Sequence, residues 1–138
     1  MKKAIILSGP QASGKSWTAM AIATGYENES YTGLPPDDIR HHEVIFICQS
    51  SPLMIIDSIK FVTKVCIIED CIKSLLQIEG FDRVRKMYPE CLFIFTTRTK
   101  IVSKEVDFKK YQLIICNYHY SLEEPASKNN IIKEGMAV

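Results

Sequence analysis

Eight consecutive residues match a pattern that binds phosphate groups. They are Gly9, Pro10, Gln11, Ala12, Ser13, Gly14, Lys15 and Ser16, and they fit G-x-x-x-x-G-K-[ST] at every fixed position. The glycines let the backbone approach an anion closely, and the unpaired N–H groups at the start of a following helix attract it. The Lys15 ammonium would reach the β- and γ-phosphates, and the Ser16 hydroxyl would bind Mg²⁺. This spacing predicts a site for a nucleoside triphosphate such as ATP.

The flanking residues supply the elements that such a loop needs. The apolar run 3–8 predicts a buried strand, and the alanine-rich segment 17–25 predicts a helix that ends near Gly25. Trp17, the single tryptophan, opens that helix and is expected in the core or beside the base of the nucleotide. A chance match with both correct flanks is rare, so we predict nucleotide binding.

An acidic pair follows another apolar run. Residues 65–68 predict a buried strand that ends in Glu69 and Asp70. Glu69 would hold Mg²⁺ through water, and Asp70 would act as, or help to position, the general base of hydrolysis, although either carboxylate could be the metal ligand. The alternative is a pair of solvated acids. Asp57 is the competing acid, but its separation from Val65 is too short for a helical crossover between parallel strands.

Polar residues also end the apolar run 91–96. Thr96 and Thr97 stand at its end, and Arg98 follows. A threonine hydroxyl here could hold the attacking water, although β-propensity alone also favours threonine in a strand. Arg98 could neutralise phosphate charge within its own chain or in a neighbouring subunit, or it could be an ordinary surface arginine.

The remaining periodicity predicts an α/β fold. Two more apolar runs, 44–48 and 113–116, bring the predicted strands to five. The predicted helices cover 53–61, 71–78 and 81–87, although 53–57 could instead be a strand. Such a pattern favours a mainly parallel five-stranded sheet covered on both faces, a three-layer α/β/α arrangement. Ligands bind such sheets at the carboxyl ends of the strands, where Gly9, Glu69 and Thr96 fall.

The composition fits one globular domain. The 138 residues are 46% hydrophobic and 24% charged, so we expect a single domain over 1–138, with a loosely packed tail at 117–138. The net charge of +1 gives no general attraction to nucleic acid or to a membrane surface. No apolar run is long enough to span a bilayer, and no leader is evident before the first strand, which predicts a cytoplasmic location.

The cysteines and the lysines give weaker signals. The five cysteines, which are expected to be free thiols and mostly buried, are Cys48, Cys66, Cys71, Cys91 and Cys116. No C-x-x-C pair suggests a metal site. A run of lysines follows the fourth strand: Lys100, Lys104, Lys109 and Lys110. Glu105 and Asp107 interleave with these lysines, so a solvated face is favoured over a nucleic-acid surface.

Most of residues 1–116 resemble the P-loop NTPases, in particular small ATPases of the AAA-type and superfamily-three helicase division found in phages and mobile elements. In this resemblance, the strand that ends in Glu69 and Asp70 is similar to a Walker B strand with the usual order of the acids reversed. Thr96 and Thr97 resemble the sensor-1 position. The resemblance implies a sheet in which the fourth strand lies between the first and the third. Little chain is left for a helical lid or a DNA-reading hairpin.

Three functions fit these observations. The first is a MgATP hydrolase, activated by a protein partner or by homo-oligomerisation and linked to DNA or mobile-element processes. The second is a small-molecule kinase in which the loop 26–43 binds the phosphoryl acceptor, although few arginines are present for such a role. The third is a nucleotide-dependent switch without turnover.

Overall fold

The computed structural model describes residues 1–23, 44–48, 50–59, 63–69, 72–116 and 131–132. Several features predicted from the sequence lie outside these ranges. They are the helix stop at Gly25, the loop 26–43, Asp70, Cys71 and nearly all of the tail 117–138.

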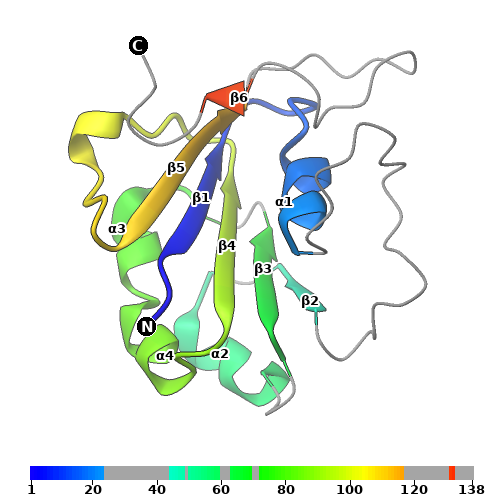
Figure 1. Cartoon of the computed structure of the whole chain (residues 1–138), viewed down its shortest axis with the longest axis vertical. Coiled ribbons are helices and arrows are strands. Elements are labelled where there is room, and N and C mark those ends of the chain that lie inside the picture. The colour runs from blue at the N-terminus through cyan, green and yellow to red at the C-terminus, as the bar shows by residue number, and fades with distance from the viewer. Residues whose placement is uncertain (24–43, 49, 60–62, 70–71, 117–130, 133–138) are drawn as a thin grey trace.

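A parallel sheet forms the centre of the molecule (Figure 1). Its strands are β1 (Ala4–Ser8), β2 (Val44–Ile47), β3 (Val65–Glu69), β4 (Leu92–Thr97) and β5 (Tyr111–Cys116). These five strands lie in the order β2-β3-β4-β1-β5 and pair in parallel. The predicted α/β class and the place of the fourth strand between the first and the third are therefore confirmed.

A sixth strand extends the sheet at the β5 edge. β6 (Ile131–Ile132) pairs antiparallel with β5, opposite Cys116 and Ile115. The sequence did not predict it, because two residues are too few to show a strand period.

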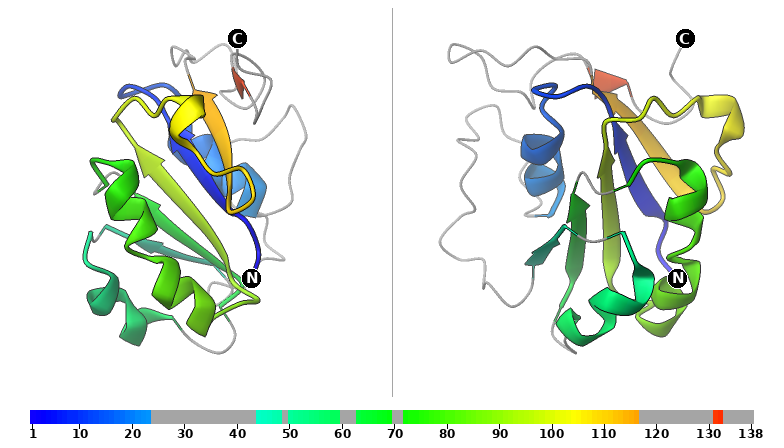
Figure 2. Two further views of the ribbon diagram at one scale, coloured as in Figure 1. Left: turned by 90° about the vertical axis from the view of Figure 1, so that its left-hand side faces the viewer. Right: turned by 180° about the vertical axis from the view of Figure 1, so that it is seen from behind.

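Two hydrophobic cores cover the opposite faces of the sheet. Ile5 and Leu7 of β1 pack in the core that contains Ala19 of α1 (Lys15–Ala23). Ala4 and Ile6 of β1 pack in the other core, which receives α2 (Pro52–Ile55), η2 (Ile56–Ser58), α3 (Leu75–Glu79) and α4 (Asp82–Met87). Figure 2 shows α1 on one face and these helices on the other. Strands buried on both faces explain why the apolar runs in the sequence are continuous.

Two of the predicted helices have different bounds in the structure. The segment predicted as 53–61, whose type the sequence left open, is helical as far as residue 58: Pro52 occupies the first turn of α2, and η2 then ends at Ser58. The helix predicted from residue 71 begins later, at Leu75. The reason is that the Ser74 hydroxyl caps it by accepting a hydrogen bond of 3.2 Å from Gln77 N.

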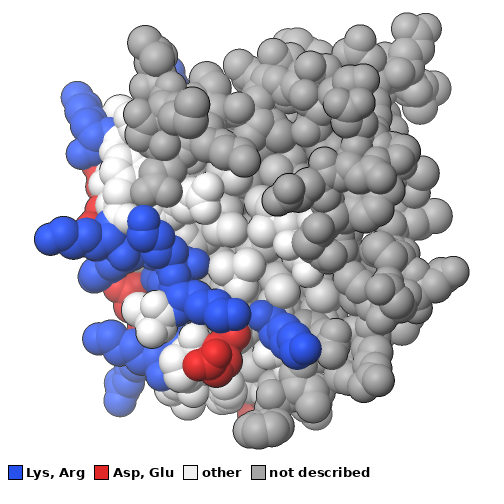
Figure 3. Space-filling view, in the orientation of Figure 1, with Lys and Arg blue, Asp and Glu red and all other residues white. Residues whose placement is uncertain are grey.

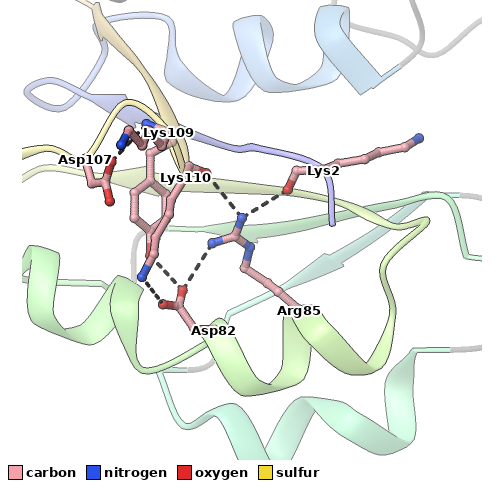
Figure 4. Close-up of polar contacts among 7 residues, drawn as sticks. Lys2, Asp82, Arg85, Asp107, Lys109 and Lys110 are labelled. Atoms are coloured by element: carbon pink, nitrogen blue, oxygen red, sulfur yellow. Dashed lines mark hydrogen bonds and ion pairs between the residues drawn. The ribbon is translucent and has the colours of Figure 1, made fainter.

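A buried arginine joins several elements at the amino-terminal edge of the sheet (Figure 4). Arg85 is 1% exposed, and its guanidinium donates hydrogen bonds to Lys2 O at 3.0 Å and to Lys110 O at 3.3 Å. It also lies 3.1 Å from Asp82 Oδ1, which accepts a hydrogen bond of 2.8 Å from Tyr111 Oη. Burial and this carboxylate raise the pKa of Tyr111, so the phenol stays a donor. The buried charge is therefore fully partnered.

The cysteines divide into two kinds. Cys66, Cys91 and Cys116 are buried free thiols, as predicted, and burial raises the pKa of Cys91 and of Cys116 to about 11. Cys48 is exposed and disulfide-bonded, so the prediction of a free thiol is wrong for this residue. It follows β2, which lies at the edge of the sheet and is only partly buried.

The helices in the described part of the chain are all too short or too polar to cross a bilayer.

Candidate phosphate-binding site

The loop between β1 and α1 lies at the carboxyl-terminal edge of the sheet. The strand register places Ser8 beside Thr97 and Glu69 beside Thr96. Since β1, β3 and β4 are parallel and adjacent, their ends meet at this edge, where parallel sheets bind ligands. The structure therefore places Glu69, Thr96 and Thr97 at the same edge of the sheet as the loop, and Asp70 lies outside the described residues.

Two residues with positive φ shape the loop. Gly14 has a φ of 88° and Ala12 a φ of 61°. The left-handed conformation costs an L-residue such as alanine about 1–2 kcal/mol. Such strain is concentrated at ligand-binding sites, and alternation between right- and left-handed residues turns backbone N–H groups toward an anion. The loop geometry is thus suited to phosphate.

Gly9 is needed because three backbone segments meet around it. A Cβ at this position would lie 2.1 Å from Cys116 O and 2.6 Å from Ser13 Oγ, both well inside contact distance. Gly9 N also donates a hydrogen bond of 3.1 Å to Thr97 O. The first fixed glycine of the motif therefore lets the loop lie against β5 and β4.

Lys15 begins α1 and is 6% exposed. Its ammonium donates a hydrogen bond of 2.9 Å to Pro10 O across the loop. The first turn is held by Thr18, whose N–H and hydroxyl both bond to Gly14 O, at 2.9 and 2.7 Å. A positive charge and the positive end of a helix dipole therefore coincide at the loop.

A pocket of about 320 Å³ opens over the loop. Its lining residues are Gln11, Ala12, Ser13, Gly14, Lys15, Ser16, Trp17 and Arg98. This volume is at the lower end of the range of small-molecule sites. Arg98 comes from the segment after β4, so the fold brings it to the loop, whereas Gly9 and Pro10 do not line the pocket.

Two buried side-chain oxygens in the described residues have no hydrogen-bond partner: Ser13 Oγ and Glu69 Oε1. Ser13 is 2% exposed and belongs to the loop, and Glu69 ends β3 at the same edge. An unsatisfied buried polar group costs about 1–3 kcal/mol, and buried polar atoms are rarely left in this state. Both unpaired oxygens therefore lie at the edge of the sheet that carries the loop.

The strand alternation decides which polar residues face α1 and the loop. Ile67 of β3 and Ile94 of β4 belong to the core beneath α1. Glu69 and Thr96 come two residues later in these strands and so point to the same face, side by side. Thr97 points to the opposite face.

Thr97 has a structural role in place of the predicted one. It is fully buried, and its hydroxyl donates a bond of 2.6 Å to Ile72 O and accepts one of 3.1 Å from Thr99 N. The hydroxyl thus joins the segments that follow β3 and β4. The Thr97 hydroxyl is therefore engaged by backbone groups, and Thr96 is the threonine on the loop face.

Ser8 is a site residue that the sequence analysis did not identify. It is 2% exposed, and its hydroxyl donates a bond of 2.7 Å to Thr99 O and accepts one of 3.1 Å from Ile101 N. A serine directly before the first glycine of the motif was the available signal. Its partner Thr99 is 91 residues away in sequence, which no local pattern reveals.

The oxygen donors at this edge fit Mg²⁺ in part. In the described residues, no group of three or more His, Cys, Asp or Glu side chains could hold a metal. Mg²⁺ at nucleotide sites needs only one or two protein oxygens, because phosphates and water complete its shell. Ser16 in the pocket lining and Glu69, with its unpaired oxygen, are such donors. Asp57, the competing acid, lies in η2 on the other face of the sheet.

Part of the lysine run that was predicted to be a solvated face lies beside the first residues of the chain. Four exposed lysines lie at the amino-terminal edge, where β5 pairs with β1: Lys2, Lys3, Lys109 and Lys110. Asp82 lies 3.4 Å from Lys110 Nζ, and Asp107 accepts a hydrogen bond from Lys109 N. Figure 3 shows the cationic side chains gathered on one side of the molecule with acidic ones among them. The pocket lies at the opposite edge of the sheet.

Comparisons with protein-family models, with curated proteins and with solved structures found no match to this chain. The site is therefore assigned from its own geometry.

Proposed function

We propose that the chain has the P-loop NTPase fold and that it binds and hydrolyses a nucleoside triphosphate such as ATP with Mg²⁺. One observation supports this most strongly. The residues of the sequence motif from Gln11 onward line a pocket at the carboxyl-terminal edge of a parallel sheet, where Glu69 has an unpaired carboxylate oxygen. A glycine loop that matched the motif by chance would not be expected to line a pocket at this edge of the sheet.

The loop residues would bind the phosphates. The N–H groups around Ala12 and Gly14 and at the start of α1 would donate hydrogen bonds to phosphate oxygens. The Lys15 ammonium would exchange its bond with Pro10 O for a phosphate oxygen, which gains a charge-assisted contact.

The acidic side of the site would support hydrolysis. Ser16 and Glu69 would hold Mg²⁺, which when bound offsets the negative charge of the phosphates. Glu69 and Thr96 lie on the loop face, so their side chains can orient a water molecule there. Only one of the two threonines can take part in this step, because the Thr97 hydroxyl donates its hydrogen bond to Ile72 O.

A nucleotide-dependent switch without turnover is the second candidate. The Thr97 bond to Ile72 O connects the ends of β3 and β4 and leaves one threonine, Thr96, on the loop face. Binding without hydrolysis would need only the loop, Lys15 and the Mg²⁺ ligands. Measured phosphate release separates the two candidates.

The position of Trp17 in the pocket lining provides the test. Titration of the protein with MgATP should change the fluorescence of this single tryptophan in a saturable way. Lys15→Ala should weaken binding at least tenfold, since a charge-assisted contact is lost. Lys86→Ala, an exposed lysine on α4, is the matched control and should titrate like the wild type. Equal affinity of the wild type and Lys15→Ala would contradict the proposal.

A further inference from the structure

Arg98 joins the loop residues in the lining of the pocket although it comes from another element. Of the lining residues, two are cationic: Lys15 at the start of α1 and Arg98 after β4. An anion in this pocket would therefore meet positive charge from two separate parts of the fold. The two cations also differ in geometry, since an ammonium is a point charge and a guanidinium is a planar fork that can bind two phosphate oxygens.

The backbone is held on both sides of Arg98. Before it, Thr97 O accepts a hydrogen bond of 3.1 Å from Gly9 N, and the Thr97 hydroxyl accepts one of 3.1 Å from Thr99 N. After it, Thr99 O accepts a bond of 2.7 Å from the Ser8 hydroxyl. Ser8 and Gly9 lead directly into the phosphate-binding loop. The loop and Arg98 therefore share one support, which fixes the base of the arginine relative to the loop.

We propose that Arg98 contacts the terminal phosphate of a bound nucleoside triphosphate and so selects triphosphate over diphosphate, with Ser8 as its positioning residue. This inference rests on the proposed function. The loop and Lys15 would hold the phosphates, and Arg98, which lines the same pocket, is the second cation that a third phosphate could reach. A diphosphate is shorter and lacks the group that Arg98 binds.

The first test compares the affinities for MgATP and MgADP, measured by calorimetry on the full chain. The wild type should bind MgATP at least tenfold more tightly than MgADP, as expected from one charge-assisted contact. Arg98→Ala should lower the MgATP affinity about tenfold and leave the MgADP affinity unchanged. Arg98→Lys should give an intermediate ratio, because it keeps the charge and loses the fork. Arg83→Ala, an exposed arginine on α4, is the control and should keep the wild-type ratio.

The second test concerns Ser8. Ser8→Ala removes the bond to Thr99 O and should reduce the ratio of the two affinities, whereas Ser8→Thr keeps a hydroxyl and should retain more of it. Because both affinities are measured on the same folded protein, a loss of stability alone does not change their ratio. The double variant Ser8→Ala with Arg98→Ala should have the ratio of Arg98→Ala, since one residue acts through the other.

Several results would overturn this inference. A wild type that binds MgATP and MgADP equally, or an Arg98→Ala variant that keeps the wild-type ratio, excludes Arg98 as the contact to the terminal phosphate. If Lys15→Ala has lost both nucleotides in that second case, the proposed function stands. A Ser8→Ala variant with the wild-type ratio removes the positioning role. A wild type that binds neither nucleotide refutes the proposed function and this inference together.

Discussion

The two edges of the sheet treat buried polar groups in opposite ways. At the amino-terminal edge, the Arg85 guanidinium is bonded to two backbone carbonyls and to Asp82, which also binds Tyr111. At the carboxyl-terminal edge, Ser13 Oγ and Glu69 Oε1 have no partner in the described residues. The fold thus provides hydrogen-bond partners for a large buried arginine at one edge and, within the described part of the chain, provides none for the small Ser13 hydroxyl at the other. We infer that the amino-terminal edge serves stability and that the carboxyl-terminal edge is shaped for a ligand.

Backbone geometry follows the same division. The positive φ values of Ala12 and Gly14 both occur in the loop at the carboxyl-terminal edge. No positive φ occurs at the amino-terminal edge in the part of the chain that the structure describes. Strain and unpaired oxygens therefore coincide, as is typical of a binding site.

The largest expected effect is a loss of unfolding free energy caused by a substitution at the amino-terminal edge. Arg85→Ala should lower the free energy of unfolding by about 3–5 kcal/mol, because it removes a fully buried side chain together with its bonds to Asp82, Lys2 O and Lys110 O. Denaturant unfolding measures the change. The affinity for MgATP, determined on the folded fraction, should stay at the wild-type value. A variant that is as stable as the wild type would contradict the structural role of this edge.

Gly9→Ala should affect both properties. The added Cβ would collide with Cys116 O and Ser13 Oγ, and relief of that collision moves the loop away from β5. We expect a loss of about 1–3 kcal/mol in unfolding free energy, as for other overpacked sites, together with a large loss of MgATP affinity. Gly80→Ala, at the end of α3, is the control, because the closest atom to its Cβ would be Gln77 O at 3.2 Å. Unchanged nucleotide affinity in Gly9→Ala would show that the loop position does not matter for binding.

Glu69→Gln should separate ligand binding from stability. The variant removes a charge whose Oε1 has no partner, so the free energy of unfolding should stay equal or increase by about 1 kcal/mol. The Mg²⁺-dependent part of the MgATP affinity should fall about tenfold, since a charged ligand of the metal is lost. Titrations with and without Mg²⁺, combined with thermal unfolding, measure both quantities. A strongly destabilised variant would assign Glu69 to the structural class of Arg85.

The smallest expected effect concerns loop strain. Ala12→Gly relieves a left-handed alanine but adds entropy to the unfolded chain, so a net gain of about 0.5 kcal/mol in unfolding free energy is expected. A rise of about 1–2 °C in the melting temperature would show it. Ala21→Gly, inside α1, is the comparison and should be destabilising, because glycine disfavours a helix interior. A destabilised Ala12→Gly variant would mean that the loop is not strained.

The orientation of Thr96 and Thr97 could not be predicted from the sequence. Thr96 and Thr97 are neighbours of the same type at a strand end, and both were candidates for the hydroxyl that holds the attacking water. The strand period requires them to point to opposite faces, but the sequence does not state which face belongs to α1. The packing of Ile94 beneath α1 decides it, because Thr96 is two residues later in the same strand and therefore points to the same face.

The sequence alone determined the motif from Gly9 to Ser16, the strand before it, the helix after it and the parallel character of the sheet. It could do so because these features depend on local spacing and on continuous apolar runs. The tertiary structure decided that Arg98 joins the pocket, that Glu69 has an unpaired oxygen there, and that Ser8 bonds to Thr99. These contacts join residues far apart in the chain, and only the packing of β1 between β4 and β5 brings them together.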